Sequence, residues 1–160
     1  MGTIQNSINQ MLGSAAGAAT LGKHISNQNK ELEVKKVEAE KELYNANAAL
    51  EDNTSAIVDK EIAEKGYGNA EVDPDKILEN KANEAYNTWQ EAQDETVRRE
   101  VLKDMYPSPE NNMWWGKANK RMEKATEALQ EAYAEQDARK NLKFNFDIAK
   151  KKYEALGGKK

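Results

Sequence analysis

The 160-residue chain contains no cysteine and only one histidine, His24. The lack of cysteine excludes disulfides and thiolate chemistry. A zinc site usually takes several histidine or cysteine ligands, so none is expected within one chain. Proline and glycine are also scarce, with three and nine residues gathered in a few clusters. The stretches between these clusters are rich in Ala, Glu, Lys and Leu, a composition typical of long helices.

Sequence motifs that carry catalysis or nucleotide binding are missing as well. The chain has no Walker loop, dinucleotide fingerprint, nucleophile elbow or HExxH motif. Its many carboxylates have the spacing of solvated helix faces. We therefore predict no catalytic, cofactor-binding or metal-binding residues, no cofactor and no enzymatic activity.

The net charge changes sign along the chain. Residues 1–30 carry a net charge of +2, residues 31–112 carry −11 and residues 113–160 carry +5. A basic last helix lying against acidic earlier helices explains this distribution. Nucleic acid is the weaker alternative partner, bound through a basic face around Lys150–Lys152, because four glutamates interrupt the basic side of that helix.

Turn and cap residues predict three helices, over about residues 4–65, 74–105 and 109–156. Asp73 before Pro74 and Ser108 before Pro109 are typical helix starts, and Gly157 is a typical stop. The segment 51–55, "EDNTS", is a weaker signal at which the first helix is expected to bend or restart. At ~1.5 Å per residue the first helix would reach roughly 90 Å and the last roughly 70 Å.

The predicted fold is therefore all-α and elongated, with a long N-terminal helix followed by an antiparallel helical hairpin. The expected organisation is an N-terminal small-residue segment with the long helix over 1–65, a linker over 66–73, the hairpin over 74–156 and a tail over 157–160.

Alternate steps of four and three residues along the first helix meet mostly apolar or small side chains, the 3.5-residue period of a coiled coil. Alanine and glycine gain little from burial, at ~0.8 kcal/mol per CH₂, but they let helices approach closely. Such a helix needs neighbours on more than one side, so we predict a homo-oligomer. The predicted oligomer seam consists of Ile4, Ile8, Met11, Ala15, Ala18, Gly22, Ile25, Leu32, Leu43, Leu50 and Ile57.

The two later helices also have apolar faces. One face of the second helix is predicted to hold Leu78, Ala82, Ala85, Trp89, Gln93, Val97, Val101 and Met105. The third is predicted to hold Ala118, Met122, Ala125, Leu129, Ala132, Leu142, Phe146, Ala149, Tyr153 and Leu156. We expect Trp89, Trp114 and Trp115 to form the core of the hairpin; the alternative is that they contact a partner.

The stretch "MLGSAAGAATLG" (Met11–Gly22) is apolar and uncharged. A signal peptide is not expected, because residues 1–10 have no lysine or arginine. About 12 apolar residues are also fewer than the ~20 that span a bilayer. Two interpretations remain: a small-residue helix packed inside the oligomer, and transient membrane contact through residues 1–22.

The order "INQMLGSAAGAATLGKH" and then "ISNQNKELEVKKVEAEKEL", within residues 4–60, resembles bacteriophage DNA-pilot or ejection proteins. The resemblance implies a virion component, assembled in the host cytoplasm with other virion proteins, that forms a helical tube or plug and helps the genome cross the host envelope. Two alternatives stay open. One is a helical adaptor or chaperone-like binding module of the bacterial cytoplasm, and the other is a membrane-perturbing protein acting through residues 1–22.

Overall fold

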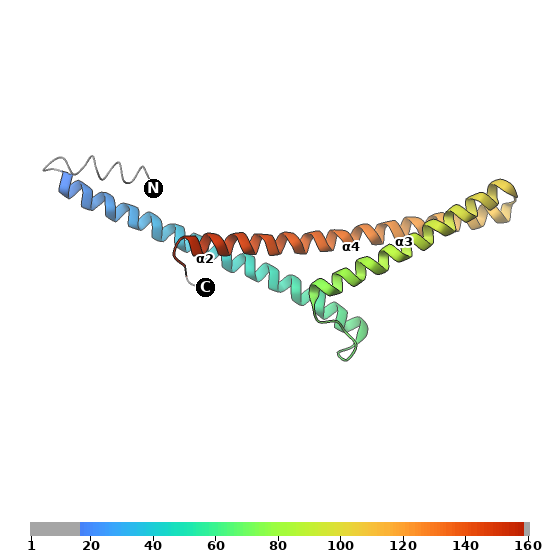
Figure 1. Ribbon diagram of the computed structural model, residues 1–160, viewed down its shortest axis with the longest axis horizontal. Coiled ribbons are helices and arrows are strands. Elements are labelled where there is room, and N and C mark those ends of the chain that lie inside the picture. Colours follow the sequence, from blue (N-terminus) through green and yellow to red (C-terminus); the bar gives the residue numbers. More distant parts are fainter. Residues whose placement is uncertain (1–16, 159–160) are drawn as a thin grey trace. The chain divides into compact units, whose positions relative to one another are not determined.

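The computed structural model describes the backbone of residues 17–158 and the side chains of residues 27–158. Within this range the protein is all-α, as predicted, with three helices and no strand. These are α2 (Gly17–Lys65), α3 (Pro74–Met105) and α4 (Pro109–Ala155), which follow one another along the chain in Figure 1. The seam residues Ile4, Ile8, Met11 and Ala15 lie outside the described backbone. Those at Ala18, Gly22 and Ile25 lie in α2, but their side chains are not among the described ones.

The helix ends follow the predicted cap residues. Asp73 is the N-cap of α3 and its Oδ1 accepts a hydrogen bond from the Asp75 backbone N–H at 3.0 Å. Ser108 Oγ likewise accepts from the Asn111 backbone N–H at 3.0 Å at the start of α4. Glycines with positive φ follow two helices, Gly66 at 81° and Gly157 at 85°. Only glycine adopts such a conformation without strain, so these two residues terminate α2 and α4.

The first helix does not restart at residues 51–55, because α2 is helical through the whole segment. Thr54 turns its hydroxyl back to donate to the Leu50 carbonyl at 3.0 Å, one turn earlier. Its polar group is thus satisfied within the helix, and it does not compete with the backbone ladder.

The chain divides into two compact units, one of Met1–Asn47 with Asn145–Lys160 and one of Ala48–Phe144. The boundary between them falls inside α2 and α4. In the first unit, α2 and α4 are antiparallel, since Glu42 pairs with Lys152 at 3.1 Å while Lys36, earlier in α2, lies beside Gly157, later in α4.

The second unit contains the predicted antiparallel hairpin of α3 and the first part of α4 (Figure 1). The hydroxyl of Thr96 reaches the Ala118 carbonyl oxygen at 3.2 Å, and Asp75 pairs with Arg139 at 2.6 Å. Between these two contacts each helix advances by 21 residues, which is three heptads. The hairpin therefore keeps one register along this length, as an antiparallel coiled coil does.

Alanine forms most of the hairpin core. Ala118, Ala125 and Ala132 recur every seven residues on α4 and are at most 5% exposed, and Ala82 on α3 is also buried. Such small side chains allow the two helix axes to come close. All ten residues predicted for the packed face of α4 are buried or half-buried, so that prediction is confirmed.

The predicted face of α3 is correct only as far as Trp89. Beyond it the half-buried residues include Ala92, Thr96 and Arg99, spaced by four and three, whereas Gln93, Val97, Val101 and Met105 are exposed. The prediction followed apolar residues in repeated steps of four, which drift around the helix. The helices keep the heptad register instead, and they place a threonine and an arginine in it.

Candidate functional site

Arg139 is the point at which all three helices of the second unit meet. It is a charged residue with only 7% exposure. Its Nε donates to Asp75 Oδ1 on α3 at 2.6 Å, and its Nη1 donates to Asn53 Oδ1 at 3.0 Å and Thr54 Oγ1 at 2.9 Å on α2. The planar guanidinium, with five N–H donors in a fixed geometry, suits this role, since one side chain satisfies acceptors from two helices.

The sequence contained a signal for Arg139 that the prediction missed. Arg139 lies seven residues after Ala132 and continues the row of Ala118, Ala125 and Ala132. A charged residue at a seam position is expensive to bury and needs partners. Glu135, four residues before Arg139, does not pair with it and instead pairs with Lys81 on α3 at 2.8 Å.

Asp75 is held by two cations at the first turn of α3. Lys143 Nζ lies 2.8 Å from its Oδ2 and Arg139 Nε lies 2.6 Å from its Oδ1. The hydrogen bonds from Lys143 and then from Arg139 lower the pKa of Asp75 below its usual 3.8. A carboxylate in the first turn is also favoured by the positive end of the helix dipole. Asp75 therefore stays charged and connects the start of α3 to α4.

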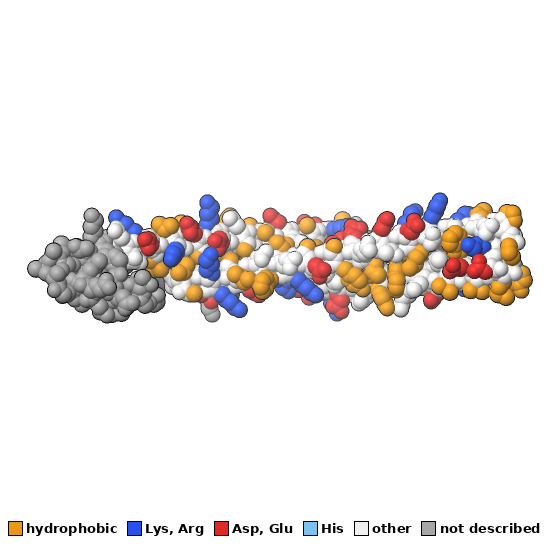
Figure 2. All heavy atoms as spheres, turned by 90° about the horizontal axis from the view of Figure 1, so that it is seen from above, with side chains coloured by type: hydrophobic (Ala, Val, Ile, Leu, Met, Phe, Trp, Pro, Cys, Tyr) orange, Lys and Arg blue, Asp and Glu red, His pale blue; other side chains and the backbone are white. Residues whose placement is uncertain are grey.

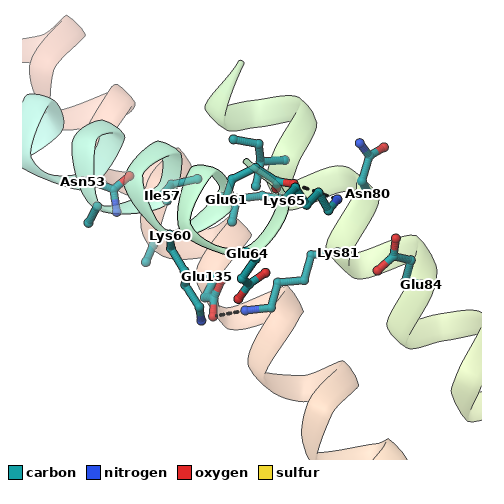
Figure 3. Close-up of a pocket in the computed structure, with 14 residues that line it drawn as sticks. Asn53, Ile57, Lys60, Glu61, Glu64, Lys65, Asn80, Lys81, Glu84 and Glu135 are labelled. Atoms are coloured by element: carbon teal, nitrogen blue, oxygen red, sulfur yellow. Dashed lines mark hydrogen bonds and ion pairs between the residues drawn. The ribbon is translucent and has the colours of Figure 1, made fainter. Parts of the chain in front are cut away.

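A groove of about 480 Å³ lies beside this junction, between the last turns of α2, the start of α3 and part of α4 (Figure 3). We call it the junction groove. Its apolar wall is made by Ile57, Ile77 and Leu78, two of which are almost fully buried. Its charged rim, visible in Figure 3, consists of Lys60, Glu61, Glu64, Lys65, Lys81, Glu84 and Glu135.

Two ion pairs neutralise part of the rim. Glu61 is only 7% exposed and its Oε1 lies 2.7 Å from Lys65 Nζ, and Lys81 Nζ lies 2.8 Å from Glu135 Oε1. The hydrogen bond that Lys65 donates to Glu61 raises the pKa of Lys65, and the one that Lys81 donates to Glu135 raises the pKa of Lys81. Both lysines therefore remain cationic at neutral pH. Glu64 and Glu84, both exposed, are the further acidic groups beside them.

The structure does not bring the three tryptophans together. Trp89 stacks on Tyr86 of its own helix, with ring centroids 6.0 Å apart. Trp114 and Trp115 lie at the start of α4, where they face the C-terminal part of α3. Lys103 Nζ lies 4.0 Å from the Trp115 ring, and Arg99 lies 5.4 Å from the Trp114 ring. All three indoles are half-buried, and cations over two of them contribute about 0.5–1 kcal/mol each.

The predicted oligomer seam has mixed surroundings in the described part of α2. Leu32 is 44% exposed, whereas Leu43, Leu50 and Ile57 are half-buried. Leu43 lines a hollow of about 420 Å³ in the first unit together with Phe146 and Tyr153 of α4. At Leu43 the seam thus faces the chain's own α4, and at Ile57 it faces the junction groove.

Among the residues that the structure describes, no group of three or more acidic, histidine or cysteine side chains is placed to hold a metal ion. No helix in the described part of the chain is long and apolar enough to cross a membrane.

An amphipathic groove lies at one end of the second unit, and exposed apolar side chains lie at the other end of its hairpin. Comparisons of the chain with protein-family models, with curated proteins and with solved structures found no match.

Proposed function

We propose that this chain is a non-enzymatic structural protein that acts as a homo-oligomer. In its specific form it is a bacteriophage virion component, assembled in the host cytoplasm together with other virion proteins, that takes part in assembly or genome ejection. The general proposal is supported by the described structure. The specific one is supported by the order of the small-residue and Lys/Glu-rich segments within residues 4–60.

The observation that carries the general proposal is the contrast between a thin core and a large exposed apolar surface. Within the described range, six of the eight buried hydrophobic residues are alanines, and no large side chain is fully buried. Meanwhile Val34, Val37 and Tyr44 on α2 are 57%, 61% and 73% exposed. Because an alanine core contributes little per residue, covering these larger side chains by further copies is an available source of stability.

Sedimentation equilibrium and native mass spectrometry on the full chain, over a wide concentration range, test this proposal. We expect a defined mass of several chains that shifts to lower values on dilution. A single-chain mass at all concentrations, with helical circular dichroism retained, would contradict it.

A further inference from the structure

The first unit contains a hollow of about 420 Å³ between α2 and α4, which we call the α2–α4 hollow. Every residue that lines it belongs to the first unit, so one chain supplies the whole site. Its volume falls within the range of about 300–1,000 Å³ that is typical of small-molecule sites. The hollow is therefore large enough for a ligand of moderate size.

Exposed apolar surface alone does not identify a site on this protein. Figure 2 shows hydrophobic side chains exposed among charged ones over much of the face that it draws. Such residues are common on protein surfaces and need no ligand to explain them. The α2–α4 hollow is distinguished by a combination of groups, because aromatic rings and carboxylates line the same concave surface.

Three aromatic side chains line the hollow. Phe146 and Tyr153 of α4 are half-buried beside Leu43, and Tyr44 of α2 is 73% exposed. The ring of Tyr153 packs directly against Gly158, so closely that a Cβ at Gly158 would have no room. This contact holds the ring in place. The faces of aromatic rings carry partial negative charge and attract cations.

The charged groups of the hollow favour a cation as well. They are Glu40 on α2 and Glu154 and Lys150 on α4, which leaves a net charge of −1. Within the described part of the chain, no ion pair joins either glutamate to a cation, and the buried Oε1 of Glu154 has no hydrogen-bond partner. A carboxylate held partly out of water without a partner costs free energy. A cation in the hollow would offset this cost by Coulomb attraction.

We propose that the α2–α4 hollow binds an organic ammonium cation with an apolar body, such as an alkylamine or arylalkylamine. The apolar body packs against Leu43 and Phe146, and the ammonium group lies near the tyrosine rings and the carboxylates of Glu40 and Glu154. The single positive charge of such a ligand balances the net charge of the lining groups. This inference goes beyond the proposed function, because it assigns a ligand site within one chain.

The test compares two small probes on the full chain at pH 7. Benzylamine is cationic at this pH, and benzyl alcohol is an uncharged analogue of almost the same shape. Saturation-transfer NMR observes the probe and gives its affinity at any mass of the protein. We expect benzylamine to bind about 10-fold more tightly than benzyl alcohol, because only the cation interacts with the carboxylates and the ring faces.

Three variants locate the binding in the hollow. Glu154→Gln keeps the shape of the side chain but removes its charge, so it should weaken benzylamine about 5-fold and leave benzyl alcohol unchanged. Tyr44→Leu removes a ring at an exposed position and should weaken benzylamine about 2- to 5-fold. Lys150→Met removes the competing cation and should strengthen benzylamine about 2- to 5-fold.

Two matched controls lie at exposed positions of α4 in the second unit. They are Glu123→Gln and Tyr133→Leu, and both should bind benzylamine as the unchanged chain does. Circular dichroism verifies that each variant keeps its helices.

The proposed site is wrong if benzyl alcohol binds as tightly as benzylamine, if Glu154→Gln and Tyr44→Leu leave the affinity for benzylamine unchanged, or if Lys150→Met weakens it. An equal loss of affinity in the two control variants would place the binding elsewhere on the chain and also overturn the proposal. None of these outcomes bears on the homo-oligomer, whose mass sedimentation measures separately.

Discussion

Replacing Arg139 with methionine should lower the free energy of unfolding by about 2–3 kcal/mol. The change removes two hydrogen bonds to Asn53 and Thr54, each contributing about 1 kcal/mol. It also removes the ion pair with Asp75, which contributes about 1 kcal/mol or less because that carboxylate is half exposed and keeps Lys143. If Asp75 were fully buried, removing Arg139 would lower the free energy of unfolding by about 3–5 kcal/mol. Methionine retains the volume and flexibility that fill this seam position.

Urea unfolding followed by circular dichroism at 222 nm measures this difference. Two controls isolate the role of the junction. Lys143→Met removes the exposed partner of Asp75 and should cost less than about 1 kcal/mol. Arg139→Lys keeps the charge but loses the forked geometry, so it should destabilise nearly as much as methionine.

An Arg139→Met variant that unfolds at the urea concentration of the unchanged chain would refute the reasoning. It would mean that the desolvation of the guanidinium cancels its hydrogen bonds, and that the junction contributes specificity of packing without stability.

Three further predictions concern packing, backbone and pH, each measured by urea unfolding. Ala132→Leu should destabilise the hairpin by about 1–3 kcal/mol, because Ala132 is 1% exposed at the close helix contact. The control Ala134→Leu, at an exposed position, should leave the free energy of unfolding nearly unchanged. Equal destabilisation by the two substitutions would exclude close packing at Ala132. Gly116→Ala should stabilise α4 by about 0.5–1 kcal/mol, since a Cβ there meets nothing within 4 Å. Gly66→Ala should destabilise the protein by about 1–2 kcal/mol, because the φ of Gly66 is 81°. A change in the free energy of unfolding of the same sign for both substitutions would contradict this reasoning. The pKa of Asp75 is below 3.8 in the folded state, so its contribution is complete above about pH 5 and is lost as pH falls through its folded-state pKa. Asp75→Asn should therefore flatten this acid dependence, and an unchanged pH profile would refute the assignment.

Helix type and helix ends could be predicted because they depend on local chemistry. Asp73, Ser108 and Gly157 act within a few residues of themselves, so their effect is visible in the sequence. The continuous helix at residues 51–55 was not predictable in the same way. Asn53 and Thr54 are poor helix formers, and their favourable contacts come from Arg139, which lies 85 or more residues later in the chain.

The packed face of α3 shows the second limit of sequence reasoning. Val97 and Val101 are the apolar residues of that region, yet they are exposed, whereas Thr96 and Arg99 lie on the packed side. The partner helix decides this choice, since its alanines at every seventh residue require heptad spacing opposite them. Hydrophobicity alone therefore assigned the wrong side of α3, and the junction groove, which is built from all three helices, had no signal in any one of them.

The contacts of Thr96 with Ala118 and of Asp75 with Arg139 fix the register of the two helices of the hairpin. A single inserted residue in either arm would misplace every pair beyond it by about 100° of helix rotation. Seven residues added to both arms at once would restore all pairs and lengthen the hairpin by roughly 10.5 Å. Natural or designed versions of this hairpin should therefore differ in length by whole two-turn increments, changed in both arms together.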